Sequence, residues 1–233
     1  MNYGEIERQT FKTFLAFSSV LIALVLIFIN ITSNFYRVST ITYLSDKDLN
    51  KSSLESLKGT SIWLVDDTYF DSFYLANPTV EKISIVKELP STLVIDVTIS
   101  EKLAYIQDNR QSPPRTFILY KNLYIRDVNT NSGLLSLKIN NGPVREGFYE
   151  EMVTFALTLK KYSINMSNVD MEFDGTSISI SHFDTNFDLG DPSDLARKAS
   201  VIGYYLTEEP CNGEIRLVYS EEGSEIRAVT NCN

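Results

Sequence analysis

The chain contains a single histidine, His182, and this limits the catalytic chemistry that the sequence can support. A Ser-His-Asp triad would need His182 as its base, and a histidine-based metal site would need further histidines or cysteines at characteristic spacing. His182 follows the strand-like stretch SISIS and precedes the acidic stretch FDTNFD, which is typical of a surface residue. We therefore expect neither a catalytic triad nor a metal site.

Carboxylates are plentiful, but their spacing does not define a reactive site. The segment Asp170–Gly175 (DMEFDG) begins like a calcium loop and then lacks the remaining ligands and the terminal glutamate. It therefore predicts a strand followed by a turn. The ten glycines form no phosphate-binding loop. We predict no enzyme, no cofactor and no small-molecule substrate. A membrane-tethered hydrolase that uses carboxylates is kept as an alternative, behind the two binding functions described below.

The two cysteines, Cys211 and Cys232, are too few for a disulfide scaffold or a structural zinc site. The stretches EIRLVY and SEIRAVT read as a hairpin that turns at Glu221–Gly223. That register would place the cysteines opposite each other at the open end, with Cβ atoms roughly 4.5–5.5 Å apart. They either form a disulfide or remain two thiols, and the sequence favours neither.

The net charge of −9 excludes another class of function. The charges within residues 1–12 (Glu5, Glu7, Arg8 and Lys12) cancel, so the acidity belongs to the rest of the chain. An acidic domain repels phosphate backbones, so we expect no nucleic-acid binding. Trp63 and the thirteen tyrosines lack basic neighbours and are expected in the core or on strand surfaces.

Residues 13–36 contain no charged side chain, and residues 14–31 are mostly apolar. Eighteen helical residues span about 27 Å, close to the hydrocarbon thickness of a bilayer. A cleaved signal peptide is the alternative, but its apolar region would be shorter and a small-x-small site would follow. A buried core helix is a further alternative. Because twelve leading residues cannot fold alone, we predict a cytoplasmic N-terminus and extracytoplasmic domains.

Residues 37–102 predict one small module with the order β-α-α-β-β. A short strand lies within Arg37–Leu44, and two short helices follow, the second ended by Asn77-Pro78. Two strands then fold back at Glu88–Ser91. In the second of them apolar residues alternate with other residues from Leu93 to Ser100, which is typical of a half-buried strand.

Residues 103–233 predict an α+β domain with a mostly antiparallel sheet. Two helices interrupt the strands: one has a stripe that starts at Phe148, and the other starts at Asp191-Pro192, a plausible N-cap and N1 pair. The predicted strands are 104–107, 117–120, 123–128, 134–139, 169–173, 177–180, 214–219 and 224–230.

The order of these parts resembles the FtsQ/DivIB family of bacterial cell-division proteins. The motifs that carry the resemblance are Gly59, Trp63, Val65-Asp66, Pro78-Thr79-Val80, VKELPSTLVIDVTISEKLA, and LGDPSDLARKASVIGYYL with Lys198. The resemblance implies four parts. They are a cytoplasmic tail (1–12), a transmembrane helix (13–36), a POTRA-like domain of the FtsQ type (37–102) and an FtsQ/DivIB-like β domain (103–233).

The resemblance also implies a function and a binding edge. The family scaffolds the division machinery at the septum and binds the bitopic proteins FtsL and FtsB, the latter called DivIC in some bacteria. The residues implied in partner binding are Tyr219, Ser224, Glu225, Ile226, Arg227, Ala228, Val229 and Thr230. A terminal strand with an open edge is a template for strand addition. The alternative is a POTRA-containing adaptor for transport or secretion, which would be expected to carry more POTRA copies or a barrel.

Overall fold

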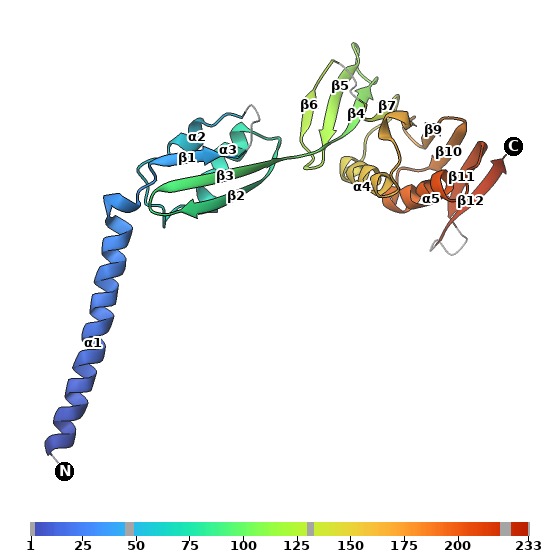
Figure 1. Cartoon of the computed structure of the whole chain (residues 1–233). Helices are drawn as coiled ribbons and strands as arrows, with labels where there is room; N and C mark the ends of the chain where they lie inside the picture. Colours follow the sequence, from blue (N-terminus) through green and yellow to red (C-terminus); the bar gives the residue numbers. More distant parts are fainter. Residues whose placement is uncertain (1–2, 45–48, 130–132, 220–224, 233) are drawn as a thin grey trace. The chain divides into compact units, whose positions relative to one another are not determined.

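The computed structural model describes residues 3–44, 49–129, 133–219 and 225–232 (Figure 1). Its first element, helix α1 (Tyr3–Thr32), contains the apolar window Phe11–Ile29, with a mean hydropathy of 2.4 and no part buried within the protein. Nineteen helical residues span about 28 Å, which matches a bilayer core. It is the one helix of this kind among the described residues, and it suggests single-pass membrane anchoring.

The chain divides into two compact units, Met1–Ile99 and Ser100–Asn233. After α1 and the short turn η1 (Asn34–Tyr36), the first unit has the predicted order β-α-α-β-β. Its sheet has the strand order β1-β3-β2, in which β1 is parallel and β2 antiparallel to β3. The elements are β1 (Thr40–Tyr43), α2 (Ser52–Glu55), η2 (Asp67–Phe70), α3 (Asp71–Ala76), β2 (Val80–Glu88) and β3 (Thr92–Ile99).

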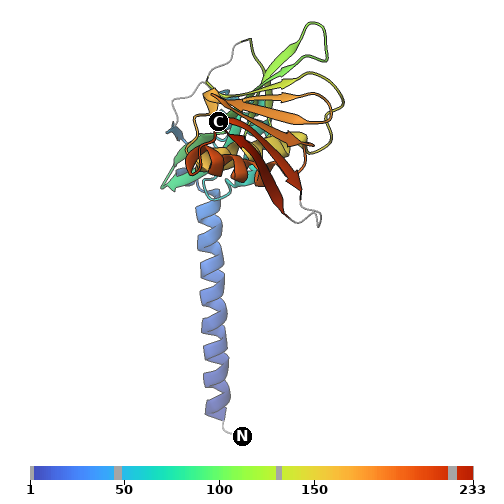
Figure 2. The same cartoon turned by 90° about the vertical axis from the view of Figure 1, so that its right-hand side faces the viewer.

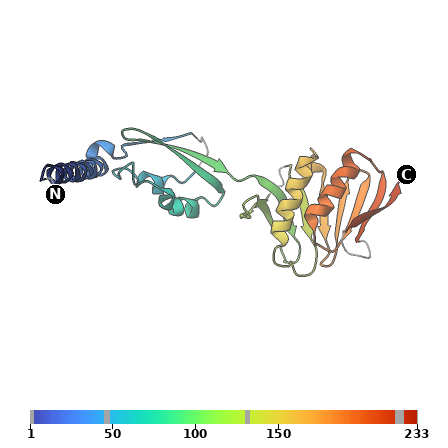
Figure 3. The same ribbon diagram turned by 90° about the horizontal axis from the view of Figure 1, so that it is seen from below.

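The alternating pattern of β3 determines which face of this sheet the helices cover. Leu93, Ile95 and Val97 are buried, whereas Asp96 and Thr98 are exposed. Helices α2 and α3 lie on one side of the hairpin (Figure 3). A one-residue slip would expose all three apolar side chains, each of which contributes about 1.5–3 kcal/mol by burial. Their partners from the helical segments are Leu54, Leu57, Phe70 and Phe73.

Asn77 connects the two helical segments of the first unit. Its side-chain amide donates to the carbonyl oxygens of Asn50 (2.9 Å) and Phe73 (3.0 Å), and its Oδ1 accepts the Asn50 N–H (2.8 Å). Asn77 is 7% exposed, so these bonds satisfy a buried polar group. Helix α3 ends at Ala76, as Asn77-Pro78 predicts.

The second unit is built on one nine-stranded sheet with the order β12-β11-β10-β9-β8-β7-β4-β5-β6. The α+β class is confirmed, but the sheet is mixed and not mostly antiparallel. Three neighbouring pairs are parallel: β4 with β7, β7 with β8, and β10 with β11. The strands are β4 (Lys102–Asp108), β5 (Arg115–Tyr120), β6 (Ile125–Asp127), β7 (Leu135–Ile139), β8 (Asp170–Phe173), β9 (Ile178–His182), β10 (Thr185–Gly190), β11 (Gly213–Tyr219) and β12 (Ile226–Cys232).

Two helices cover one face of this sheet (Figure 3). Helix α4 (Phe148–Lys161) joins β7 to β8, and α5 (Leu195–Thr207) joins β10 to β11. Both connections join parallel neighbours, which a tight hairpin cannot do. The third parallel pair, β4 and β7, is joined through β5 and β6. Four residues of the predicted stripe, which extends to Tyr162, are buried in the core: Phe148, Met152, Phe155 and Leu159. Tyr162 follows the helix and is half-buried.

Helix α5 begins at Leu195, so the predicted start at Asp191-Pro192 is wrong. The Asp191 carboxylate accepts the backbone N–H (2.7 Å) and the hydroxyl of Ser193. This local turn uses the capping oxygen before a helix can form, a competition typical of aspartate. The N-cap position falls on Asp194, whose φ is 52°.

Gly203 of α5 packs directly against Tyr162, the residue that follows α4. A Cβ at this position would overlap the ring of Tyr162. Glycine in a helix interior costs about 1 kcal/mol relative to alanine, so packing against the ring accounts for its presence.

We expect Gly203→Ala to lower the free energy of unfolding by about 1–3 kcal/mol, because the ring has to move. In a Tyr162→Ala background the sign should reverse, since only the gain of about 1 kcal/mol in helix propensity remains. Urea unfolding of the detergent-solubilised chain measures both values. Destabilisation of equal size in the two backgrounds would contradict this packing.

Candidate partner-binding edge

Strand β12 is the outermost strand of the large sheet. It pairs with β11 in the register Leu217↔Ala228, and the two strands lie side by side (Figure 2). Within the part of the chain that the structure describes, no strand pairs with the other edge of β12. An edge strand presents backbone N–H and C=O groups that another chain can bind.

The two faces of β12 differ in exposure. Ile226 and Ala228 are half-buried and pack against the core of the second unit. Arg227 and Val229 alternate with them, and Val229 is 59% exposed. Val218 of β11 lies opposite Arg227 and is 37% exposed. The edge is therefore anchored on one face and carries exposed valines on the other.

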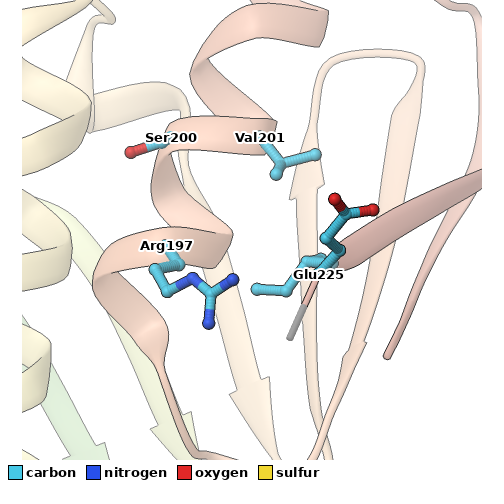
Figure 4. Close-up of a pocket in the computed structure, with 5 residues that line it drawn as sticks. Arg197, Ser200, Val201 and Glu225 are labelled. Atoms are coloured by element: carbon cyan, nitrogen blue, oxygen red, sulfur yellow. The ribbon is translucent and has the colours of Figure 1, made fainter. Parts of the chain in front are cut away.

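A groove of about 370 Å³ lies between α5 and the start of β12. Figure 4 shows Arg197 and Val201 extending from α5 toward the strand, with Glu225 at its start. The groove thus combines apolar carbon with one charge of each sign. It is a place where side chains of an added segment can lie. Its lining is Arg197, Ser200, Val201, Glu225 and Ile226.

Tyr219 fastens the end of β11 to the segment that precedes α5. Its hydroxyl lies 3.2 Å from Asp194 Oδ2 and 3.3 Å from Ser193 Oγ. Burial, together with the nearby Asp194 carboxylate, raises the pKa of the Tyr219 phenol. Tyr219 pairs with Ile226 in the ladder, so these contacts also position the start of β12.

Lys198 lies beneath Tyr219 and is only 1% exposed. Its Nζ lies 5.4 Å from the centroid of the Tyr219 ring, donates to the Asp191 carbonyl (2.6 Å) and lies 3.6 Å from Asp191 Oδ1. Burial lowers the pKa of Lys198, and the carboxylate of Asp191 opposes that shift. The hydroxyl of Ser193 is the main cause of the lowered pKa of Asp191.

The sequence motif singled out Lys198 but did not indicate this arrangement. A signal was present, because Lys198 lies three residues after Leu195 and four before Ile202, within the apolar stripe of α5. A lysine at such a spacing faces the core.

Cys211 and Cys232 are joined by a disulfide, with Cα atoms 5.2 Å apart. The predicted register is wrong, because Cys232 lies opposite Gly213 and not opposite Cys211. Cys211 lies just before β11, and its carbonyl oxygen accepts the hydroxyl of Thr185 (2.6 Å). The bond therefore fixes the last residues of β12 to a buried point beside β10.

The structure gathers most of the predicted docking residues at one edge. Tyr219 ends β11 and Glu225 immediately precedes β12. Ser224, and the predicted turn at Glu221–Gly223, lie outside the described residues. The remaining five lie on β12: Ile226, Arg227, Ala228, Val229 and Thr230. The role of all eight predicted docking residues in partner binding stays a prediction.

The residues that first suggested chemistry lie apart from this edge. His182 ends β9, and its ring packs against Phe183 with centroids 4.7 Å apart. Asp170–Phe173 form β8, and the Asp174 carboxylate accepts the N–H groups of Thr176 and Ser177 (2.8 Å each), so the predicted strand and turn are confirmed. Among the described residues, no three His, Cys, Asp or Glu side chains form a group that could hold a metal ion.

Residues 37–98 match the family model of the FtsQ-type POTRA domain. No curated protein gives a significant match. The chain therefore combines a membrane-anchoring helix, an FtsQ-type POTRA domain and an α+β unit with a large mixed sheet.

The POTRA match supports the FtsQ/DivIB family of bacterial cell-division proteins, and the large sheet fits the C-terminal β domain of that family. FtsQ-type POTRA domains are protein-interaction modules in division, and their family is a family of non-enzymatic scaffolds.

Loss of the disulfide should loosen β12. The bond spans 21 residues of sequence, so the double variant Cys211→Ala, Cys232→Ala should lose about 3 kcal/mol of unfolding free energy. Urea unfolding with and without reductant measures the loss. Reductant should bring the wild type to the level of the variant and leave the variant unchanged. Equal stability of the wild type and the variant, each with and without reductant, would refute the role assigned to this bond.

Proposed function

We propose that this chain is a non-enzymatic, single-pass membrane scaffold of the bacterial division machinery at the septum. It binds FtsL-like and FtsB/DivIC-like bitopic proteins through its extracytoplasmic domains. The observation that carries the proposal is the outer edge of β12, which has a strand neighbour on one side only among the described residues. The FtsQ-type POTRA domain in the same chain supports a partner from the division machinery.

The mechanism is the addition of a partner strand to β12. Its residues Ile226–Cys232 extend for about 23 Å at ~3.3 Å per residue. Each backbone hydrogen bond to an added strand contributes about 0.5–1.5 kcal/mol net, so several are needed for a stable complex. The backbone supplies affinity in this arrangement, and the side chains supply the choice of partner.

Side chains along the edge favour a selective partner. The exposed charges of Glu225 and Arg227 discriminate against like charges on an added strand. A carboxylate opposite Arg227 would contribute about 0.2–1 kcal/mol. Val229 and Val218 offer apolar contacts on the helix-free face. A partner strand with acidic and apolar residues in alternation fits this surface best.

The membrane helix makes a modest edge affinity sufficient. Anchoring the scaffold and its partners in one bilayer turns their encounter into a confined event with a high effective concentration. A short strand pairing, weak between free proteins, then holds the complex together. The proposal therefore gives α1 a thermodynamic role as well as an anchoring one.

The double variant Arg227→Glu, Val229→Glu should reduce co-purification with the FtsL-like and FtsB/DivIC-like proteins at least tenfold, because it repels an acidic strand and removes an apolar contact. The matched control is Arg126→Glu on β6, the opposite outer strand of the same sheet. Thermal unfolding should show that both variants remain folded. Undiminished binding by the β12 variant, or equal loss with the β6 control, would count against the proposed edge.

A further inference from the structure

Trp63 and Leu64 are exposed, at 43% and 51% of their surfaces, so the expectation of a core or strand-surface aromatic at Trp63 is wrong. They lie in the loop that precedes η2. The Trp63 ring packs at 5.7 Å from the ring of Tyr36, which packs at 5.2 Å from Phe35. Phe35 is itself 64% exposed. Aromatic surface thus continues from the segment after α1 into the POTRA domain.

Backbone hydrogen bonds fix this arrangement. The Ile62 N–H donates to the Tyr36 carbonyl (2.8 Å), and the Val38 N–H donates to the Thr60 carbonyl (2.9 Å). Arg37 and Ser61 form an antiparallel bridge between the same two segments. The exposed loop therefore keeps its place beside Tyr36 irrespective of the direction in which α1 points.

The aromatic residues lie within a short chain distance of the apolar span. The apolar window ends at Ile29, α1 continues to Thr32, and the turn Asn34–Tyr36 follows one residue later. Rises of about 1.5 Å per α-helical and 2.0 Å per 3-10 residue keep Tyr36 within about 15 Å of Ile29. The polar interfacial layer extends roughly 5–8 Å beyond the hydrocarbon core. This chain distance allows Phe35 and Tyr36, with Trp63 beside Tyr36, to reach the headgroup layer.

We propose that Phe35, Trp63 and Leu64 form an interfacial membrane contact that holds the POTRA domain against the bilayer surface. The occupant is the headgroup layer of the bilayer that α1 enters. Tryptophan and tyrosine favour this layer because an apolar ring with a polar edge fits between hydrocarbon and water. The inference rests on membrane anchoring by α1 and not on partner binding at β12.

The hairpin tip adds a further apolar residue at the same end of the domain. Leu89, between β2 and β3, is 55% exposed. The Ser39 N–H donates to the Ser91 carbonyl (2.9 Å), which brings the tip beside the residue that follows Val38. Leu89 extends the contact from the aromatic rings to the hairpin.

Charges of both signs lie beside this surface. Arg37, which follows Tyr36, is exposed, and its guanidinium donates to the Gly59 carbonyl (3.3 Å). The Nζ of Lys87 lies 3.5 Å from the Trp63 carbonyl oxygen, but it also faces Asp66. The hydroxyl and backbone N–H of Thr68 are the main causes of the lowered pKa of Asp66, and Lys87 lowers it further. Asp66 therefore stays ionised and offsets Lys87. Because apolar side chains make the contact, it should form on uncharged phosphatidylcholine, and Arg37 should add an attraction on anionic lipid.

Trp63 is the only tryptophan, so its fluorescence reports on the contact directly. The full chain is reconstituted in phosphatidylcholine vesicles whose acyl chains carry bromine either near the headgroup or near the chain end. We expect Trp63 emission to be quenched at least twofold more by the shallow bromines than by the deep ones. Aqueous acrylamide should quench Trp63 in the vesicles at least twofold less than it quenches Trp63 of the chain unfolded in detergent-free urea.

Two matched reporters in a Trp63→Phe background separate the causes of failure. Phe17→Trp, within the apolar window, should be quenched most by the deep bromines. Leu75→Trp should be quenched by acrylamide alone. Leu75 lies in α3 and is 84% exposed, on a different element from Trp63, Leu64 and the hairpin tip.

Quenching of Trp63 by acrylamide but not by either lipid, with Phe17→Trp still quenched by deep bromines, would overturn the contact and leave the anchoring intact. Protection of Trp63 only when a partner protein is added would also overturn it, because the occupant would then be protein. If Phe17→Trp were not quenched by lipid, the anchoring and the contact would fail together.

Discussion

The backbone of β12 has donors and acceptors along an edge where no described strand pairs with them. Such an edge must be ordered enough to act as a template and still remain unsatisfied, and these demands oppose each other because unpaired strands tend to open locally. The fold meets both demands because contacts on one face and at the end of β12 order the strand while its outer edge stays open. Ile226 and Ala228 are half-buried against the core, and the disulfide holds the end of β12 to Cys211.

The buried charge of Lys198 extends this support. A buried ammonium is costly, and its contacts with Asp191 offset that cost only in part, as the lowered pKa of Lys198 indicates. In return, Lys198 joins the segment before α5 to the ring of Tyr219, which ends the strand that pairs with β12. The lysine therefore helps to specify one arrangement of helix, turn and outer hairpin.

The sequence patterns predict the elements well where burial alternates strongly. Leu93, Ile95 and Val97 identify β3 and its covered face, and Asn77-Pro78 identifies the end of α3. Strand β10 (Thr185–Gly190) is not among the predicted strands. Its aspartates make the stretch resemble an acidic loop, although the buried Phe187 and Leu189 alternate with Asn186 and Asp188 as in a strand. In the sheet it lies between β9 and β11.

Other features depend on specific contacts, local as well as tertiary, that the residue pattern does not indicate. The start of α5 moves to Leu195 because Asp191 bonds to Ser193. The hairpin register differs from the predicted one, since pairing across β11 and β12 places Gly213 opposite Cys232. The place of β12 at the outside of the sheet fits the edge that the family resemblance implies. The groove beside β12 forms only because α5 lies next to the start of this strand. Sequence alone thus indicates the strand, and only the fold supplies its surroundings.

Amide hydrogen exchange of the full chain, alone and with its FtsL-like and FtsB/DivIC-like partners, tests strand addition most directly. The account predicts that the outward amides of β12 exchange rapidly in the free protein and at least tenfold more slowly in the complex, while those of β6 do not change. A complex that forms and leaves β12 exchange unaltered would contradict the account.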